Sequence, residues 1–468
     1  MPPLDLFTDI VETDKQHTNY RLITSGMCGP ELEVIQSWSD GFIDRDGKFV
    51  QEFQTTFNSS FWELYLHATF RHLGVRLDFT HSSPDFVAHC GEQAFVAEAT
   101  IASHPEGYTA EWERDVSPDS IQKLKPKEIV ELATVRLANA IDGKWKKYRQ
   151  QYSKLAHVRG KPFVICVAPF DQPFFFMQSD NALRRVLYGH DRLLYFDNQS
   201  TGDRVILGEL RAENFAKPSG ATVPIGFFRD NRMADVSAVI FSNTATFGKV
   251  RALSKDGAYP MLFTALRYND YGLVPIQICA EKPDYEESLL DGLHVCLNPF
   301  ATHPLDERIF EGHEVCVHRF DPAAELYLPS SPHGFLFQRS VMTFPPRDVA
   351  REARTRAPEA KPMIPWPTDE WPEGELVGIT ASVGPFTDHH MAHYRNWTIL
   401  VVRDREDDDW SSQAIAASVD GLDEYIQLNS RTDVELLLSD QWCTTKQEAF
   451  DMIKAQIDTK LIALSGES

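Results

Sequence analysis

Two acidic residues, Asp85 and Glu98, flank a segment whose pattern predicts a β-hairpin with its turn at residues 90–93. If the first and last turn residues face each other, counting back along both strands places Asp85 directly across from Glu98. Like charges directly opposite each other destabilise a sheet, so such a pair needs a compensating cation. Hard divalent ions take carboxylate oxygens as ligands. The spacing therefore predicts a divalent-metal site, unless a one-residue slip of register separates the pair.

A third acid, Glu63, lies in a helix predicted over residues 58–73, which ends before Gly74. Leu66 and Phe70 follow Glu63 at helical spacing and should face the core, so Glu63 lies on or beside the buried stripe. A carboxylate there is costly unless it is paired, protonated or bound to a metal. The alternative is an ordinary first-turn acid that the helix dipole stabilises. On the first interpretation, the three carboxyl groups converge within reach of one metal ion.

The elements around these acids predict an α/β fold. Alternating or continuous apolar patterns indicate strands, and apolar residues at helical spacing indicate helices. The run at 163–167 is apolar throughout, as in a strand buried on both faces. The predicted order is helix, strand, strand, strand, helix, strand, over residues 58–73, 75–79, 85–89, 94–101, a long helix with Pro126 in its first turn, and 163–167. Apolar runs at 236–241 and 293–297 would widen the sheet.

This block resembles the core of the PD-(D/E)xK nucleases, the restriction-endonuclease-like superfamily. The resemblance rests on FWELYLHATFRHLG at 61–74, PDF at 84–86 and VAEAT at 96–100, in the family's order of elements. It covers residues 50–170 and extends to 344. It implies a mixed sheet flanked by helices. It also implies that Glu63, Asp85 and Glu98 are catalytic carboxylates that bind Mg²⁺ or Mn²⁺, and that the metal activates water for phosphodiester hydrolysis.

The chain departs from the family pattern at Thr100, which stands two residues after the second acid, where the family has its lysine. Related proteins supply a lysine from a neighbouring helix, and Lys144 is the candidate here. It lies on the edge of the apolar stripe of the long helix, whereas Lys146 and Lys147 are expected to face solvent. The alternative is that Lys144 is a surface lysine whose stem covers an apolar edge.

A basic segment at 123–161 interrupts an acidic chain. The net charge of −22 argues against sequence-blind adhesion to nucleic acid, but this stretch holds eleven Lys and Arg against three acids. As a substrate-binding track, it would contact the nucleic-acid backbone through Lys123, Lys125, Lys127, Lys146, Lys147 and Arg149. The alternative is a solvated helix face.

Composition and cysteine usage predict a cytoplasmic protein. Seven cysteines are scattered without a CxxC pair, which is typical of reduced thiols. No run approaches the roughly 18 apolar residues of a membrane helix, and the acidic N-terminus lacks the layout of a signal peptide. We therefore expect no membrane partner.

Proline content divides the chain. Seven prolines in 345–372 predict a linker between a nuclease-like domain at 1–344 and a small α+β domain at 373–468. In the latter we expect a strand at 397–402 and a closing helix capped by Thr444 or Thr445, with Glu448 at capping-box spacing. His389, His390 and His393 are expected in a loop before the strand.

The sequence thus predicts a Mg²⁺-dependent nuclease that cuts DNA, with defence against foreign or viral DNA as the setting that the resemblance implies. One alternative is a catalytically inactive relative that binds nucleic acid or a partner protein, because Thr100 replaces the lysine. Another is a hydrolase that acts on another phosphate or uses the three histidines. The choice of DNA or RNA, any sequence specificity and homo-oligomer formation are left open by the sequence.

Overall fold

The chain divides into two compact units, one formed by Met1–Tyr268 with Ile278–Arg347 and the other by Asn269–Gln277 with Asp348–Ser468. The computed structural model describes residues 4–344 apart from 27, 118–119, 122, 199–202, 212–213, 217–221, 256, 258 and 271–274, together with 377–379, 386–395, 397–404, 410–415, 436–438 and 443–465. The Pro-rich segment predicted at 345–372 lies outside the described residues.

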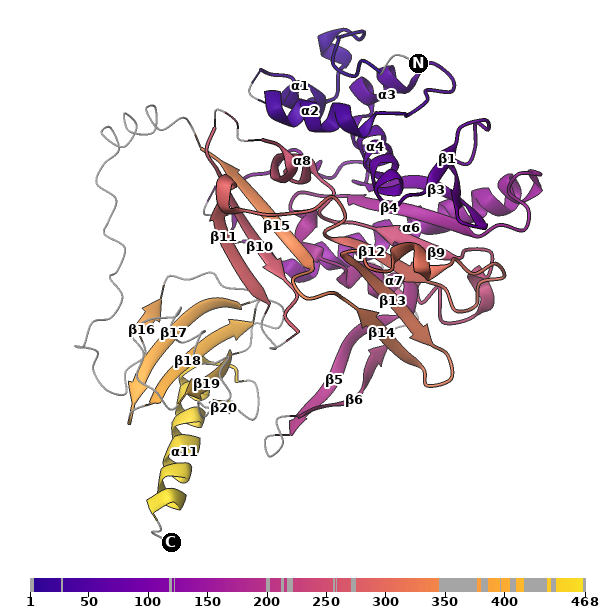
Figure 1. The fold of residues 1–468 in the computed structure, drawn as a ribbon. Helices are drawn as coiled ribbons and strands as arrows, with labels where there is room; N and C mark the ends of the chain where they lie inside the picture. The colour runs from indigo at the N-terminus through magenta and orange to yellow at the C-terminus, as the bar shows by residue number, and fades with distance from the viewer. Residues whose placement is uncertain are drawn as a thin grey trace, which may run out of the picture. The chain divides into compact units, whose positions relative to one another are not determined.

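A mixed eight-stranded sheet forms the centre of the first unit, in the order β1-β2-β3-β4-β9-β12-β13-β14 (Figure 1). Neighbours run parallel at β3/β4, β4/β9 and β12/β13 and antiparallel elsewhere. The strands are β1 (Arg76–Asp78), β2 (Phe86–Cys90), β3 (Gln93–Ser103), β4 (Phe163–Phe170), β9 (Ala238–Phe241), β12 (Leu293–Leu297), β13 (Val315–Asp321) and β14 (Leu326–Ser330).

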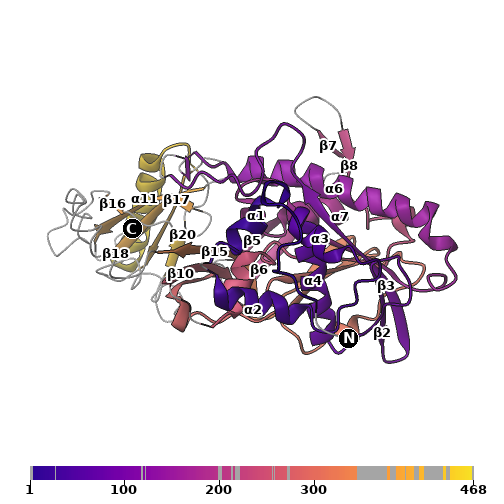
Figure 2. The ribbon, with the colours of Figure 1, turned by 90° about the horizontal axis from the view of Figure 1, so that it is seen from above.

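Helices cover both faces of this sheet, so the unit is α/β as predicted (Figures 1 and 2). On one face α4 (Phe57–His72) packs against the sheet. The same core includes residues of α1 (Thr18–Ile23), α2 (Gly29–Trp38), α3 (Phe49–Thr55) and α8 (Phe247–Leu253). The other face packs against α6 (Pro126–Gln150) and α7 (Asn181–Tyr188). The strands alternate between the two cores, and in β4 Cys166 faces the α4 side whereas Ile165 faces the α6 side.

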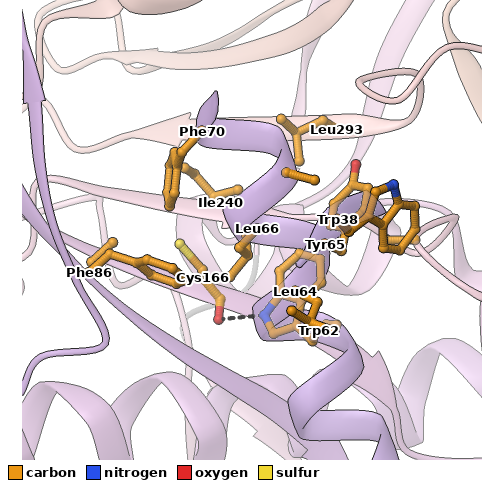
Figure 3. Close-up of a cluster of buried hydrophobic side chains, with 14 of the residues drawn as sticks. Trp38, Trp62, Leu64, Tyr65, Leu66, Phe70, Phe86, Cys166, Ile240 and Leu293 are labelled. Atoms are coloured by element: carbon orange, nitrogen blue, oxygen red, sulfur yellow. Dashed lines mark hydrogen bonds between the residues drawn. The ribbon is translucent and has the colours of Figure 1, made fainter. Parts of the chain in front are cut away.

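Helix α4 is anchored on the sheet by its predicted apolar stripe. Leu66 and Phe70 are fully buried, and the Phe70 ring meets Phe86 edge-on at 5.3 Å between centroids (Figure 3). The indole Nε1 of Trp62 donates a hydrogen bond of 3.1 Å to the carbonyl of Cys166 in β4. The helix ends at His72, one residue before the predicted end, and is followed by Gly74, whose φ of +71° suits glycine. This packing fixes the rotation of α4 and hence the position of Glu63.

The hairpin of β2 and β3 has the predicted register, running from Phe86 opposite Ala97 to Cys90 opposite Gln93. Val87 and Val96 lie in the core on the α6 side, as the alternation required. Asp85 immediately precedes β2. Glu98 is directed to the α6 side, where Lys144 and Lys147 contact it. Asp85 lies at the open end of the hairpin, where its carboxylate accepts a hydrogen bond from the amide of Ala99, next to Glu98.

Besides the large sheet there are a three-stranded sheet with the order β11-β10-β15 and two hairpins, and β11 begins at the boundary between the two units in the chain. The strands are β5 (His190–Asn198) with β6 (Asp203–Arg211), β7 (Asn214–Ala216) with β8 (Thr222–Pro224), and β10 (Met261–Arg267), β11 (Ile276–Glu281) and β15 (Leu336–Thr343). No helix among the described residues is long and apolar enough to cross a membrane.

The second unit contains a five-stranded sheet and one described helix, α11 (Lys446–Ser465). Its strands are β16 (Val377–Ile379), β17 (Phe386–Tyr394), β18 (Trp397–Asp404), β19 (Trp410–Ile415) and β20 (Leu436–Leu438). The predicted capping box is present, since Thr445 and Glu448 exchange side-chain to backbone hydrogen bonds of 3.2 Å. The loop predicted for His389, His390 and His393 is wrong, because these residues belong to β17, which pairs with β16 and β18.

Candidate active site

Glu98 is the most strongly held acid of the predicted cluster. Its side chain is 1 % exposed, and one carboxylate oxygen, Oε1, accepts three hydrogen bonds. Lys144 Nζ donates at 2.8 Å, Lys147 Nζ at 2.9 Å and the Tyr152 hydroxyl at 2.9 Å. Burial alone would raise the pKa of Glu98, but the two ammonium groups outweigh it and hold the pKa below its usual 4.5. Glu98 is therefore a carboxylate at neutral pH.

The second oxygen of Glu98, Oε2, is buried and accepts no hydrogen bond from any residue that the structure describes. A buried carboxylate oxygen without a donor is costly. It has the chemistry of a ligand for a hard cation, whose attraction would replace the missing hydrogen bond.

Asp85 is half-buried and is oriented by the backbone of the neighbouring strand. Its Oδ2 accepts a hydrogen bond of 2.7 Å from the amide of Ala99. Burial and the nearby charge of Glu98 raise the pKa of Asp85 to about 6, against the opposing effect of Lys144. The two hairpin acids, Asp85 and Glu98, thus interact electrostatically as the register predicted, with one largely ionised and the other titrating near neutrality.

Glu63 approaches the same place from α4, where it lies in the second turn and is therefore not the first-turn acid of the alternative interpretation. Burial raises its pKa to about 8, and the charge of Asp85 adds to the effect. Below that pH the carboxyl holds a proton. The three acids do not form a tight cluster: among the described residues, the group of His, Cys, Asp or Glu whose ligand atoms all lie within 4.8 Å is elsewhere. The prediction that all three carboxyl groups converge within reach of one metal ion is therefore not confirmed.

Arg45 is a residue of the site that sequence reasoning missed. Its guanidinium donates to the carbonyl of His81 at 2.7 Å and to that of Pro84 at 3.5 Å, which braces the loop leading into Asp85. Its charge opposes the raised pKa values of Glu63 and Asp85. A lone arginine in a turn between two aspartates carries no sequence signal for this position, because the contact depends on tertiary packing.

The lysines of α6 differ in part from the prediction. Lys144 lies on the edge of the buried stripe, 23 % exposed, and contacts Glu98 as expected for a helix-borne lysine. Asp142 and Gly143 do not interrupt α6, so the helical spacing of its residues continues to Gln150. Lys146 is 61 % exposed and pairs with Asp142, which agrees with the predicted solvated face.

The solvated position predicted for Lys147 is wrong. Its ammonium reaches Glu98 at 2.9 Å and lies 4.9 Å from the ring centre of Tyr152. Tyr152 follows α6 in a short 3-10 turn, where it caps the same carboxylate. Thr100 lies two residues beyond Glu98 and is paired in register with Val167 of β4.

Some of the cations in the basic segment at 123–161 already pair with acidic or aromatic side chains. Lys125 pairs with Glu128 at 2.8 Å, and Arg149 lies 3.7 Å from Asp235 and over the ring of Trp145. Lys123 and Lys127 are exposed. The residues predicted to bind a nucleic-acid backbone therefore lie on or just before α6, the helix that also carries the two lysines bound to Glu98.

Comparison with known proteins adds no relative: no family model, no curated protein and no solved structure matches this chain.

Proposed function

We propose that the first unit is a metal-dependent nuclease of the PD-(D/E)xK type, with a restriction-endonuclease-like fold, that hydrolyses DNA. The observation that supports this most strongly is the hairpin register, which brings Asp85 next to Glu98, the residue that lysines of α6 contact. Two neighbouring carboxylates repel each other, and this repulsion lowers the stability of the fold. A role in binding a cation would explain why the chain keeps both.

The residues present fit a hard divalent cation such as Mg²⁺ or Mn²⁺. Glu98 offers an unpartnered buried oxygen, and Asp85 is held beside it by the amide of Ala99. Glu63 would join them by releasing its proton, since metal ligands must be deprotonated. When bound, the ion would activate a water molecule and stabilise charge on the scissile phosphate.

Lys144 would serve as the lysine that Thr100 does not provide. Its ammonium is 2.8 Å from Glu98, and its charge also acts on Asp85. From there it would orient the attacking water or balance charge on the phosphate. Lys147 and Tyr152 would position Glu98, so that its free oxygen stays directed to the site. These two act through Glu98 and are positioning residues.

The substrate is proposed from charge. The chain is acidic overall, yet its most basic segment lies at the helix that meets the carboxylates. A phosphate backbone that follows α6 would meet exposed cations such as Lys127 and Lys146 and then reach the acids.

The test is cleavage of linear, circular and single-stranded DNA, and of RNA, with and without Mg²⁺ or Mn²⁺. We expect metal-dependent cleavage by the natural protein and none by Glu98→Gln or Asp85→Asn. Glu92→Gln is the matched control, because Glu92 is an exposed acid in the turn of the same hairpin. Equal cleavage by Glu98→Gln would contradict the proposal.

A second candidate is a catalytically inactive module that binds nucleic acid or a protein. It is favoured by the hydrogen bonds on Glu98 Oε1, because two lysines and a tyrosine would also be needed merely to stabilise a buried acid. Thr100→Lys restores the family's residue on the same strand. If neither the natural protein nor this variant cleaves any nucleic acid with either metal, the inactive module replaces the nuclease.

A further inference from the structure

A second group of ligand-type side chains lies in the first unit, away from the acids. His294 of β12 and Cys316 of β13 are register partners on adjacent parallel strands, and His318 follows two residues later on the same side. All three are buried. One potential ligand atom from each lies within 4.8 Å of the other two. Two imidazoles and a thiol are the donor set that zinc prefers.

The contacts among these atoms converge on one nitrogen. Nε2 of His318 lies 2.9 Å from Nδ1 of His294 and 3.2 Å from Sγ of Cys316. A ring nitrogen has either one hydrogen or one in-plane lone pair, so it cannot form a good hydrogen bond with both neighbours. A cation bound among the three atoms would satisfy all of them together.

The surroundings hold the ligands in place. The other ring nitrogen of His318, Nδ1, is 2.5 Å from the hydroxyl of Tyr327 in β14. Such an outer contact fixes the tautomer and orientation of a metal-binding histidine.

We propose that His294, Cys316 and His318 form a zinc site that ties β12 to β13. With three protein ligands, one position of a tetrahedron is left for a water molecule. Because the ligands are buried, the zinc stabilises the fold and does not meet substrate. The plain alternative is a metal-free hydrogen-bonded histidine pair in a polar part of the core.

This site is separate from the carboxylates. The order of the sheet places β4 and β9 between β3, which carries Glu98, and β12, which carries His294. At about 4.8 Å between neighbouring strands, the two sites are roughly 14 Å apart across the sheet. The donor sets also differ: oxygen ligands suit Mg²⁺, whereas thiolate and imidazole suit Zn²⁺. The zinc proposal therefore does not depend on the proposed nuclease activity.

The experiment is titration of the reduced, chelator-treated full chain with Co²⁺, followed by displacement with Zn²⁺. We expect one equivalent of Co²⁺ to give a thiolate-to-cobalt charge-transfer band and tetrahedral visible bands, and Zn²⁺ to abolish both. Cys316→Ser should lose the charge-transfer band and weaken Zn²⁺ binding by about 100-fold or more. Cys296→Ser is the matched control and should keep the band, because Cys296 is a fully buried cysteine of β12 outside the set.

Three results would overturn the site: no Co²⁺ spectrum from the folded natural protein, an unchanged spectrum from Cys316→Ser, or a spectrum lost in Glu98→Gln. The last variant removes an acid of the proposed nuclease site, so it separates the two metals. If Cys316→Ser does not fold, His294→Gln is the second variant. It should keep the thiolate band but bind Zn²⁺ at least about 10-fold more weakly, and unchanged affinity would also refute the site.

Discussion

Replacement of Glu63 by Gln should stabilise the metal-free protein at alkaline pH. Burial and Asp85 raise the pKa of Glu63 from 4.5 to about 8 in the folded protein. Between these two pKa values the native state keeps a proton that the unfolded chain releases. The free energy of unfolding therefore falls as pH rises from the pKa of the unfolded chain through the pKa of the folded protein. Gln resembles the protonated carboxyl and cannot ionise, so the variant avoids this loss.

The size of the effect follows from the two pKa values. Between about pH 5.5 and about pH 8.5, the shift from 4.5 to about 8 corresponds to a loss of at most about 3 kcal/mol in the free energy of unfolding. Glu63 is half-buried, and water that reaches the carboxylate reduces the penalty. We therefore expect Glu63→Gln to gain about 1–2 kcal/mol relative to the natural protein over this range.

The assay is urea unfolding of the natural protein, Glu63→Gln and Glu92→Gln at both pH values, in the presence of a chelator. Glu92 lies exposed in the hairpin turn, so its variant should follow the natural protein. Added Mg²⁺ should narrow the gap at high pH by compensating the ionised carboxylate of the natural protein. Equal stability of Glu63→Gln and the natural protein at about pH 8.5 would show that Glu63 is not destabilised by ionisation, and the reasoning about its burial would fail.

Three further outcomes are expected. Lys144→Ala should lower turnover of DNA by about 100-fold or more, whereas Lys146→Ala, which loses a solvated lysine paired with Asp142, should mainly weaken DNA binding. If Lys144→Ala cleaves as fast as the natural protein in single-turnover assays, Lys144 is not catalytic. DNA affinity should fall with added salt, with a slope of log K on log salt of about −3 to −5 if three to five cations contact phosphate; a flat profile in a fluorescence titration would count against a nucleic-acid substrate. Glu287→Gln should lower the free energy of unfolding by about 3–5 kcal/mol in urea, because the Glu287 side chain is fully buried and pairs with Lys249 at 2.5 Å and Arg339 at 2.9 Å. Glu128→Gln, which removes an exposed pair with Lys125, should lower it by less than about 1 kcal/mol, and similar losses in both variants would contradict a stabilising role for the buried ion pairs of Glu287.

The hairpin and its two acids could be predicted because local rules determine them. The turn at 90–93 fixes the register, and the side-chain period of two then decides which residues share a face with Glu98. The helix that carries Glu63 was predictable from its apolar stripe and from Gly74. Each of these inferences needs only neighbouring residues.

The partners of Glu98 could be predicted only in part. The helical wheel placed Lys144 at the edge of the buried stripe, but Lys147 reaches the same carboxylate through a long side chain, which a wheel does not represent. Tyr152 acts from a turn beyond the helix, and its direction depends on how α6 ends.

The histidine–cysteine group was not predictable for a different reason. Its members come from two strands that are adjacent in space but separated by about twenty residues of intervening chain, and no short motif records a parallel pairing. The histidines that did form a sequence cluster, His389, His390 and His393, lie instead in strand β17. Proximity in sequence was misleading there because local spacing does not show which elements pair.

The most direct test of the proposed function is DNA cleavage by the natural protein and by Glu98→Gln, each with Mg²⁺ or Mn²⁺ and with a chelator. The carboxylate of Glu98, held by Lys144, Lys147 and Tyr152 with one oxygen free, is central to the proposal. It predicts cleavage that requires the metal and falls by at least about 1,000-fold in Glu98→Gln, while the variant remains folded and binds DNA. Metal-independent cleavage, or cleavage at the natural rate by Glu98→Gln, would contradict it.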